Sequence, residues 1–114
     1  MDKKTIILIP SHNCSLKFVN VIKNLRINNI KNDILIIDDK SSDESRKIID
    51  NIKKKFKNIL VLKNSLNLGQ GGSIKRGIKF INKKYQFICT MDDDGQHHFK
   101  DVKKIIKSSY KLKL

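Results

Sequence analysis

Short apolar runs alternate with amphipathic segments along the whole chain. The apolar runs occupy residues 5–9, 34–37, 59–62 and 85–91. They are short and rich in branched aliphatic side chains, which is typical of buried strands. Apolar residues recur at helical spacing in residues 16–28, 72–82 and 100–112, and in the segment after Ser41. This alternation predicts an α/β fold with a Rossmann-like parallel sheet built from four β-α units.

Single residues predict where some of these elements end and pack. Pro10 should stop the first strand, and Ser41 with Glu44 has the spacing of a capping box before the second helix. The apolar stripe of that helix is Ile48, Ile49, Ile52 and Phe56. The third helix should turn Ile74, Ile78 and Ile81 to the core. Gly77 falls on the same stripe, which indicates a close approach to the sheet or to a ligand.

The chain has 114 residues, enough for one domain with its own core. Its longest aliphatic run, residues 6–9, is far shorter than the roughly 20 residues that span a bilayer. No signal-peptide pattern precedes the first strand. Cys14 and Cys89 lack the paired spacing of a zinc site or a disulfide framework, so both are expected to be reduced. We therefore expect a single domain over residues 1–114, located in the cytoplasm.

The formal net charge is +14, from 25 Lys and Arg against 11 Asp and Glu. A charge of this size attracts polyanions such as nucleotide phosphates, nucleic acid or an anionic membrane surface. Most of the cations are lysines spread along the chain, and aromatic residues make up only 6%. Because nucleic-acid modules usually add aromatic stacking residues or a groove-reading helix, the composition argues against nucleic acid as the partner.

A polar cluster follows each predicted strand. The clusters are Ser11-His12-Asn13, Asp38-Asp39, residues 67–72 and residues 92–98. In open parallel sheets the carboxyl ends of the strands share one edge, and ligands bind in the crevice there. The four clusters are therefore expected to meet at one site.

The most acidic cluster is Asp92-Asp93-Asp94-Gly95-Gln96. Three adjacent carboxylates repel one another unless a cation offsets their charge, and Mg²⁺ or Mn²⁺ takes oxygen ligands from carboxylates together with substrate phosphates. On an extended backbone Asp92, Asp94 and Gln96 would converge while Asp93 points elsewhere. The alternative is a solvated acidic turn.

The other clusters fit a nucleotide. Glycines in residues 67–72 precede a helix, where free N–H groups favour a phosphate, although an unliganded helix start explains them equally well. Lys75 and Arg76 could reach a diphosphate or simply face solvent. Asp38 and Asp39 could accept hydrogen bonds from a base or a ribose, or cap a helix. His12 could pack over a base or be exposed.

The motifs together resemble the nucleotide-binding half of a family 2 glycosyltransferase with the GT-A fold. The resemblance rests on four motifs in order: residues 9–13 (P-x-Y-N), 37–43 (V-D-D-G-S-x-D), 67–71 with Gly77 (N-x-G-x-G) and 92–97 (D-A-D-G-Q-H). It covers residues 5 to about 106. The last motif especially resembles that of polyprenyl-phosphate sugar transferases of envelope polysaccharide synthesis.

The resemblance implies a metal-dependent transfer of sugar from a UDP- or GDP-linked donor to a lipid-phosphate or polysaccharide acceptor, with the enzyme at the cytoplasmic face of the membrane. Asp92, Asp94 and Gln96 would hold Mg²⁺ or Mn²⁺. The nucleotide sugar would contact Pro10, His12, Asn13, Asp38, Asp39, Asn67, Gly69, Gly71, Lys75, Arg76, Asp92 and Asp93. The family's catalytic domain is about twice this long, so the chain resembles a truncated, donor-binding half without an assignable general base.

Departures from the family pattern are Lys40 for glycine, Asp93 for a small residue and His12 for tyrosine. None removes a proposed ligand. Two other classes compete. A haloacid-dehalogenase-like phosphatase shares a D-x-D-G motif, but carries it after the first strand. A non-catalytic basic domain would bind nucleotides or polyanions without needing a metal, with strong salt dependence.

Overall fold

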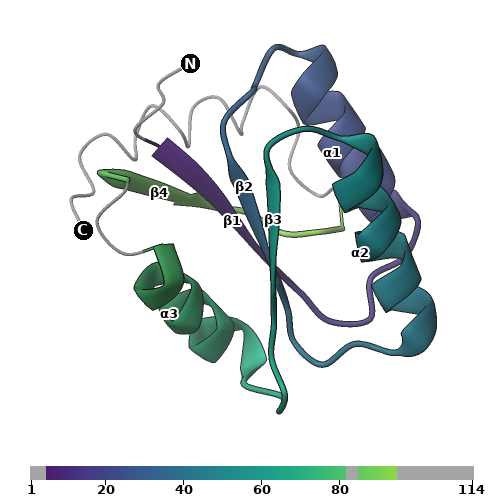
Figure 1. Cartoon of the computed structure of the whole chain (residues 1–114), viewed down its shortest axis with the longest axis vertical. Coiled ribbons are helices and arrows are strands. Elements are labelled where there is room, and N and C mark those ends of the chain that lie inside the picture. The colour runs from purple at the N-terminus through teal and green to yellow at the C-terminus, as the bar shows by residue number, and fades with distance from the viewer. Residues whose placement is uncertain (1–4, 82–84, 95–114) are drawn as a thin grey trace.

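The computed structural model describes residues 5–81 and 85–94. Its centre is a four-stranded parallel sheet in the order β3-β2-β1-β4. The strands are β1 (Thr5–Ser11), β2 (Ile34–Asp38), β3 (Ile59–Lys63) and β4 (Phe87–Thr90), and the helices are α1 (Lys17–Ile27), α2 (Asp43–Lys55) and α3 (Gly69–Ile81). Figure 1 shows α1 and α2 on one face of the sheet and α3 on the other. The predicted Rossmann-like α/β fold is confirmed.

Both faces of the central strands are buried. Along β1, Ile7 and Ile9 join the core under α1 and α2, while Ile6 and Leu8 join the core under α3. All four side chains are fully buried. A strand covered on both faces needs apolar residues at every position, which explains the continuous aliphatic runs in the sequence.

The position of the site follows from the strand order. β1 lies between β2 and β4, and the helix after β1 covers one face while α3, which leads toward β4, covers the other. The direction in which strands are added to the sheet therefore reverses at β1, and such a reversal opens a crevice at the carboxyl ends of the strands. Any ligand site is therefore expected beside the ends of β1 and β4.

The prediction that Pro10 ends the first strand is wrong. β1 continues to Ser11, and Pro10 pairs with Ile37 of β2. The pairing of β1 with β4 runs only from Thr5 to Leu8, so Pro10 lies where β1 has a neighbour on one side alone. Proline is tolerated at such edge positions because its missing N–H breaks no ladder bond there.

Two helices begin at different residues from those predicted. The N-cap of α2 is Ser42, whose hydroxyl accepts from the Ser45 N–H at 3.4 Å, because the Ser41 hydroxyl is taken by the N–H of Asn13. α3 begins at Gly69, three residues before the predicted start, with φ of 77° at that glycine. The last predicted helix, residues 100–112, lies outside the described residues.

The packing of α3 confirms the prediction for Gly77 and corrects that for Ile78. A Cβ on Gly77 would lie 3.1 Å from both Leu8 Cδ2 and Ile37 Cδ1, so the helix backbone lies directly on the sheet. This contact centres the buried stripe on Gly77 and Ile81, and leaves Ile78 36% exposed instead of in the core. Within the described part of the chain, no helix is long and apolar enough to cross a membrane.

Both cysteines are free and buried, as expected of reduced thiols in a core. Burial raises the pKa of the Cys89 thiol to about 12, and burial also raises that of Cys14 although Ser11 opposes the shift. Because the thiolate is the reactive form, we expect a thiol reagent at pH 8 to modify neither cysteine in the native protein and both in urea. Rapid modification of the folded chain, measured by absorbance, would contradict this.

Candidate donor-binding site

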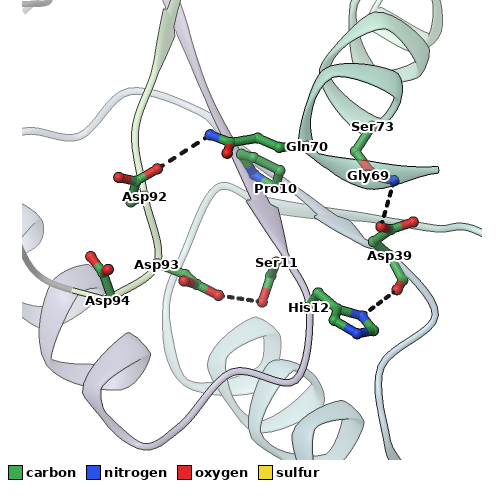
Figure 2. Close-up of a pocket in the computed structure, with 10 residues that line it drawn as sticks. All are labelled: Pro10, Ser11, His12, Asp39, Gly69, Gln70, Ser73, Asp92, Asp93 and Asp94. Carbon is green, nitrogen blue, oxygen red and sulfur yellow. Dashed lines mark hydrogen bonds between the residues drawn. The ribbon is translucent and has the colours of Figure 1, made fainter. Parts of the chain in front are cut away.

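A pocket of about 310 Å³ lies at the carboxyl edge of the sheet (Figure 2). Segments that follow all four strands contribute to it, as the sequence predicts. Its lining residues are Pro10, Ser11, His12, Asp39, Gly69, Gln70, Ser73, Asp92, Asp93 and Asp94. The volume is at the lower end of the range for small-molecule sites.

Seven residues predicted for the site line this pocket: Pro10, His12, Asp39, Gly69, Asp92, Asp93 and Asp94. Six others do not: Asn13, Asp38, Asn67, Gly71, Lys75 and Arg76. Gln96, with His97 and His98, lies outside the described residues.

Asp39 connects the end of β2 to the start of α3. Its Oδ1 accepts from the Leu68 N–H at 2.7 Å and from the Asn64 amide at 3.0 Å. Its Oδ2 accepts from the Gly69 N–H at 2.9 Å, as Figure 2 shows. Burial alone would raise the pKa of Asp39, but these hydrogen bonds outweigh it and hold the pKa below its usual value. Asp39 is therefore an anion in the pocket wall.

This contact changes the role predicted for the glycine loop. The sequence leaves two interpretations for the N-terminus of α3, a phosphate site and an unliganded helix start. The Gly69 N–H instead binds the Asp39 carboxylate, so the protein supplies its own anion at this helix end. The glycine serves the turn itself, because a φ of 77° disfavours other residues.

The loop after β1 is joined to the loop after β2. Asn13 donates its N–H to the Ser41 hydroxyl at 3.0 Å, and its Oδ1 accepts from the Ser42 N–H at 2.7 Å. His12 Nδ1 lies 2.7 Å from the Asp39 carbonyl oxygen, and His12 Nε2 lies 3.2 Å from Asn13 Nδ2. Asn13 thus braces the pocket wall from outside the pocket.

The three carboxylates after β4 all line the pocket, including Asp93. Because β4 ends at Thr90, the alternation of an extended strand does not continue through them. Asp93 accepts from the Ser11 hydroxyl at 2.7 Å, and Asp92 accepts from the Gln70 amide at 3.4 Å (Figure 2). Burial raises the pKa of Asp93, helped by the charges of its two acidic neighbours and opposed by Ser11.

Asp38 and Arg76 support the loops around the pocket. The Asp38 carboxylate is fully buried, accepts from the Ser41 N–H at 3.0 Å, and lies 3.8 Å from the Arg46 guanidinium. Arg76 donates to the Lys63 carbonyl at 2.7 Å and to Asn64 Oδ1 at 2.6 Å. Arg76, which could have reached a diphosphate, therefore holds the end of β3 against α3.

Four residues of this region were not individually predicted to contact a ligand: Ser11, Asn64, Gln70 and Ser73. Asn64 and Ser73 are buried and joined by a 3.0 Å hydrogen bond, which connects the end of β3 to α3. Asn64 directly follows β3, and this position after a strand is the sequence feature that could have predicted it. The same feature applies to Ser11 and Gln70, because each belongs to a polar segment predicted to follow a strand.

A second pocket, of about 350 Å³, lies at the opposite edge of the sheet. It is lined by Arg26, Lys31, Lys55, Phe56, Lys57 and Asn58. Arg26 donates there to three carbonyl oxygens, those of Ile30, Asn32 and Lys57. Arg26 in the last turn of α1 and Lys55 in the last turn of α2 complement the negative ends of the helix dipoles.

Residues 6–112 match the family model described as glycosyl transferase family 2. The chain is 31% identical over 122 residues to the UDP-N-acetylglucosamine--dolichyl-phosphate N-acetylglucosaminyltransferase of Methanococcus voltae, covering 93% of this chain and 47% of that protein. It is 36% identical over 101 residues to a dolichyl-phosphate beta-glucosyltransferase of Dictyostelium discoideum, covering 86% of this chain and 30% of that protein.

Among solved structures, the fold is similar to that of the mannosyltransferase PcManGT from Pyrobaculum calidifontis in complex with GDP-Man and Mn²⁺. The TM-score is 0.70 at 10% identity, covering 80% of this chain and 27% of that one. The chain spans less than half of the length of these and other curated relatives that it matches.

Proposed function

Because this chain belongs to glycosyl transferase family 2, we propose that it is the donor-binding half of a metal-dependent glycosyltransferase. The enzyme would transfer a sugar from a nucleotide sugar to a lipid-phosphate or polysaccharide acceptor. The observation that supports this most is the single pocket into which segments after all four strands bring His12, Asp39 and the Asp92–Asp94 carboxylates.

The nucleoside would occupy the side of the pocket formed by Pro10, His12 and Asp39. Asp39 Oδ2 accepts one protein hydrogen bond where Oδ1 accepts two, so Oδ2 has the greater capacity to accept one from a base or ribose. His12 would pack against the base. Asp38 would take no part in this contact, because its carboxylate accepts from the Ser41 N–H and is not part of the pocket lining.

The diphosphate would lie beside Asp92 and Asp94, which would hold Mg²⁺ or Mn²⁺ together with the phosphate oxygens. Within residues 5–81 and 85–94, no three His, Cys, Asp or Glu side chains form a complete metal site. Two carboxylates completed by substrate oxygens are a usual donor set for Mg²⁺, so the residues fit this ion. When bound, the metal supplies Lewis-acid stabilisation of the departing nucleoside diphosphate.

We further propose that residues 1–114 act as one nucleotide-sugar-binding unit. The acceptor site and the general base would lie outside the described residues. The matched relatives include transferases that act on dolichyl phosphate, which favours a lipid-phosphate acceptor for this chain. A net charge of +14 would attract the chain to the anionic cytoplasmic face of a membrane.

Calorimetric titration with UDP and GDP, each with and without Mn²⁺, tests the donor site. We expect one nucleotide to bind at least about tenfold more tightly with Mn²⁺ than without it. In the double variant Asp92→Ala, Asp94→Ala this gain should disappear, because the phosphates and the metal then lack their protein ligands.

The matched control is Asp43→Ala with Asp50→Ala, which removes the same charge from exposed positions on α2. It should bind as the wild type does. Equal nucleotide affinity with and without Mn²⁺ would contradict a metal-dependent donor site. Failure of the folded wild-type chain to bind either nucleotide would contradict the proposal that this half forms the site.

A further inference from the structure

His12 is contacted at both ring nitrogens, and each partner has only one hydrogen-bonding role. Nδ1 lies 2.7 Å from the carbonyl oxygen of Asp39, and a carbonyl oxygen can only accept. Nδ1 must therefore carry the proton in this contact.

The orientation of the Asn13 amide decides whether His12 Nε2 carries a proton. The Ser42 backbone N–H can only donate, and its partner 2.7 Å away is therefore the amide oxygen of Asn13. The remaining end of that amide is the NH₂ group, which lies 3.2 Å from His12 Nε2. Since an amide NH₂ only donates, Nε2 accepts and carries no proton.

The backbone of Asn13 is adapted to this arrangement. Its φ of 53° is in the left-handed region, which asparagine tolerates better than most residues. Its own N–H is held by the Ser41 hydroxyl at 3.0 Å. Asn13 thus joins two loops that are adjacent in space and more than 25 positions apart in the sequence.

We propose that Asn13 is a positioning residue that holds His12 as the neutral tautomer protonated on Nδ1, with both nitrogens engaged by the protein. His12 then offers the pocket only ring surface. It would take the flat face of a nucleobase by stacking, and neither ring nitrogen would be left to bind a metal. Its role toward the base rests on the proposed function; its tautomer does not.

Nitrogen-detected NMR of the imidazole rings at pH 7.5 tests the tautomer, with His12 assigned by the signals that disappear in His12→Gln. We expect a pyrrole-type signal at Nδ1 and a pyridine-type signal at Nε2. In Asn13→Asp the carboxylate still accepts from Ser42 but places an oxygen opposite Nε2. That oxygen favours a proton there, so Nε2 should become pyrrole-type as well.

Ser41→Ala is the matched control, because it removes a partner of the Asn13 backbone and leaves the amide contact with His12 in place. Its imidazole signals should match the wild type. A protonated Nε2 in the wild type, or unchanged nitrogen signals in Asn13→Asp, would overturn the proposal.

Adding UDP or GDP with diamagnetic Mg²⁺ tests the stacking role. We expect the ring C–H signals of His12 to shift while its nitrogen signals keep their types. A change of type at Nε2 would show that the ligand or the metal takes this nitrogen, which contradicts the proposal. If neither nucleotide changes any signal of the chain, the proposed function fails, while the tautomer experiment still decides the role of Asn13.

Discussion

Replacing Asp39 with alanine is expected to lower the free energy of unfolding by about 3 kcal/mol. The carboxylate accepts from the Leu68 N–H, the Gly69 N–H and the Asn64 amide, and a buried donor that loses its acceptor costs about 1–3 kcal/mol. Asn64 is only 2% exposed, so water cannot readily replace its partner. Urea unfolding followed by circular dichroism would measure the loss.

The control is Asp50→Ala, which removes an exposed carboxylate 3.9 Å from Lys63 and should change stability by less than about 1 kcal/mol. Acid unfolding adds a second test. The pKa of Asp39 is lowered by folding, so its contribution is present above its unfolded pKa and is lost as pH falls through the lower folded value. Equal stability losses in the two variants would contradict the role of Asp39.

Gly77→Leu is expected to destabilise the fold by about 3 kcal/mol, the upper end of the usual cost of overpacking. Even a Cβ at this position would lie 3.1 Å from the buried Leu8 and Ile37 side chains, and leucine adds three more carbons to that contact. α3 would have to move away from the sheet. Because Asp39 binds the N-terminus of α3, nucleotide affinity should fall with stability.

The control for this variant is Lys79→Leu, which adds the same side chain to an exposed position of α3. It should alter the unfolding free energy by no more than about 0.5 kcal/mol. Thermal unfolding of both variants by calorimetry gives the comparison. A Gly77→Leu protein as stable as the wild type would mean that α3 does not lie on the sheet as described.

The phosphatase alternative requires its D-x-D-G motif after the first strand. In this fold Asp92 and Asp94 follow β4, which lies at the edge of the sheet, and the chain belongs to glycosyl transferase family 2. The second pocket, with its four cations, is the surface on which a polyanion would be sought. Two of its four cations, Arg26 and Lys55, lie in the last turns of α1 and α2, where they complement the helix dipoles.

The sequence alone determined the fold class and the location of the site. Local patterns were sufficient because a strand buried on both faces must be apolar throughout, whereas a helix buried on one face needs a stripe. Polar residues directly after parallel strands must meet at one edge, whichever order the strands take. For this reason the sequence by itself predicts that His12, Asp39 and Asp92–Asp94 share one pocket.

Only the tertiary structure decided which polar residues face that pocket. Asp38 and Asp39 are adjacent and chemically alike, yet one braces the loop before α2 and the other lies in the pocket wall at the start of α3. Asn13 and Arg76 likewise brace loops from outside the pocket. These roles depend on hydrogen bonds between residues far apart in the chain, and local sequence patterns carry no record of which distant partner each side chain meets.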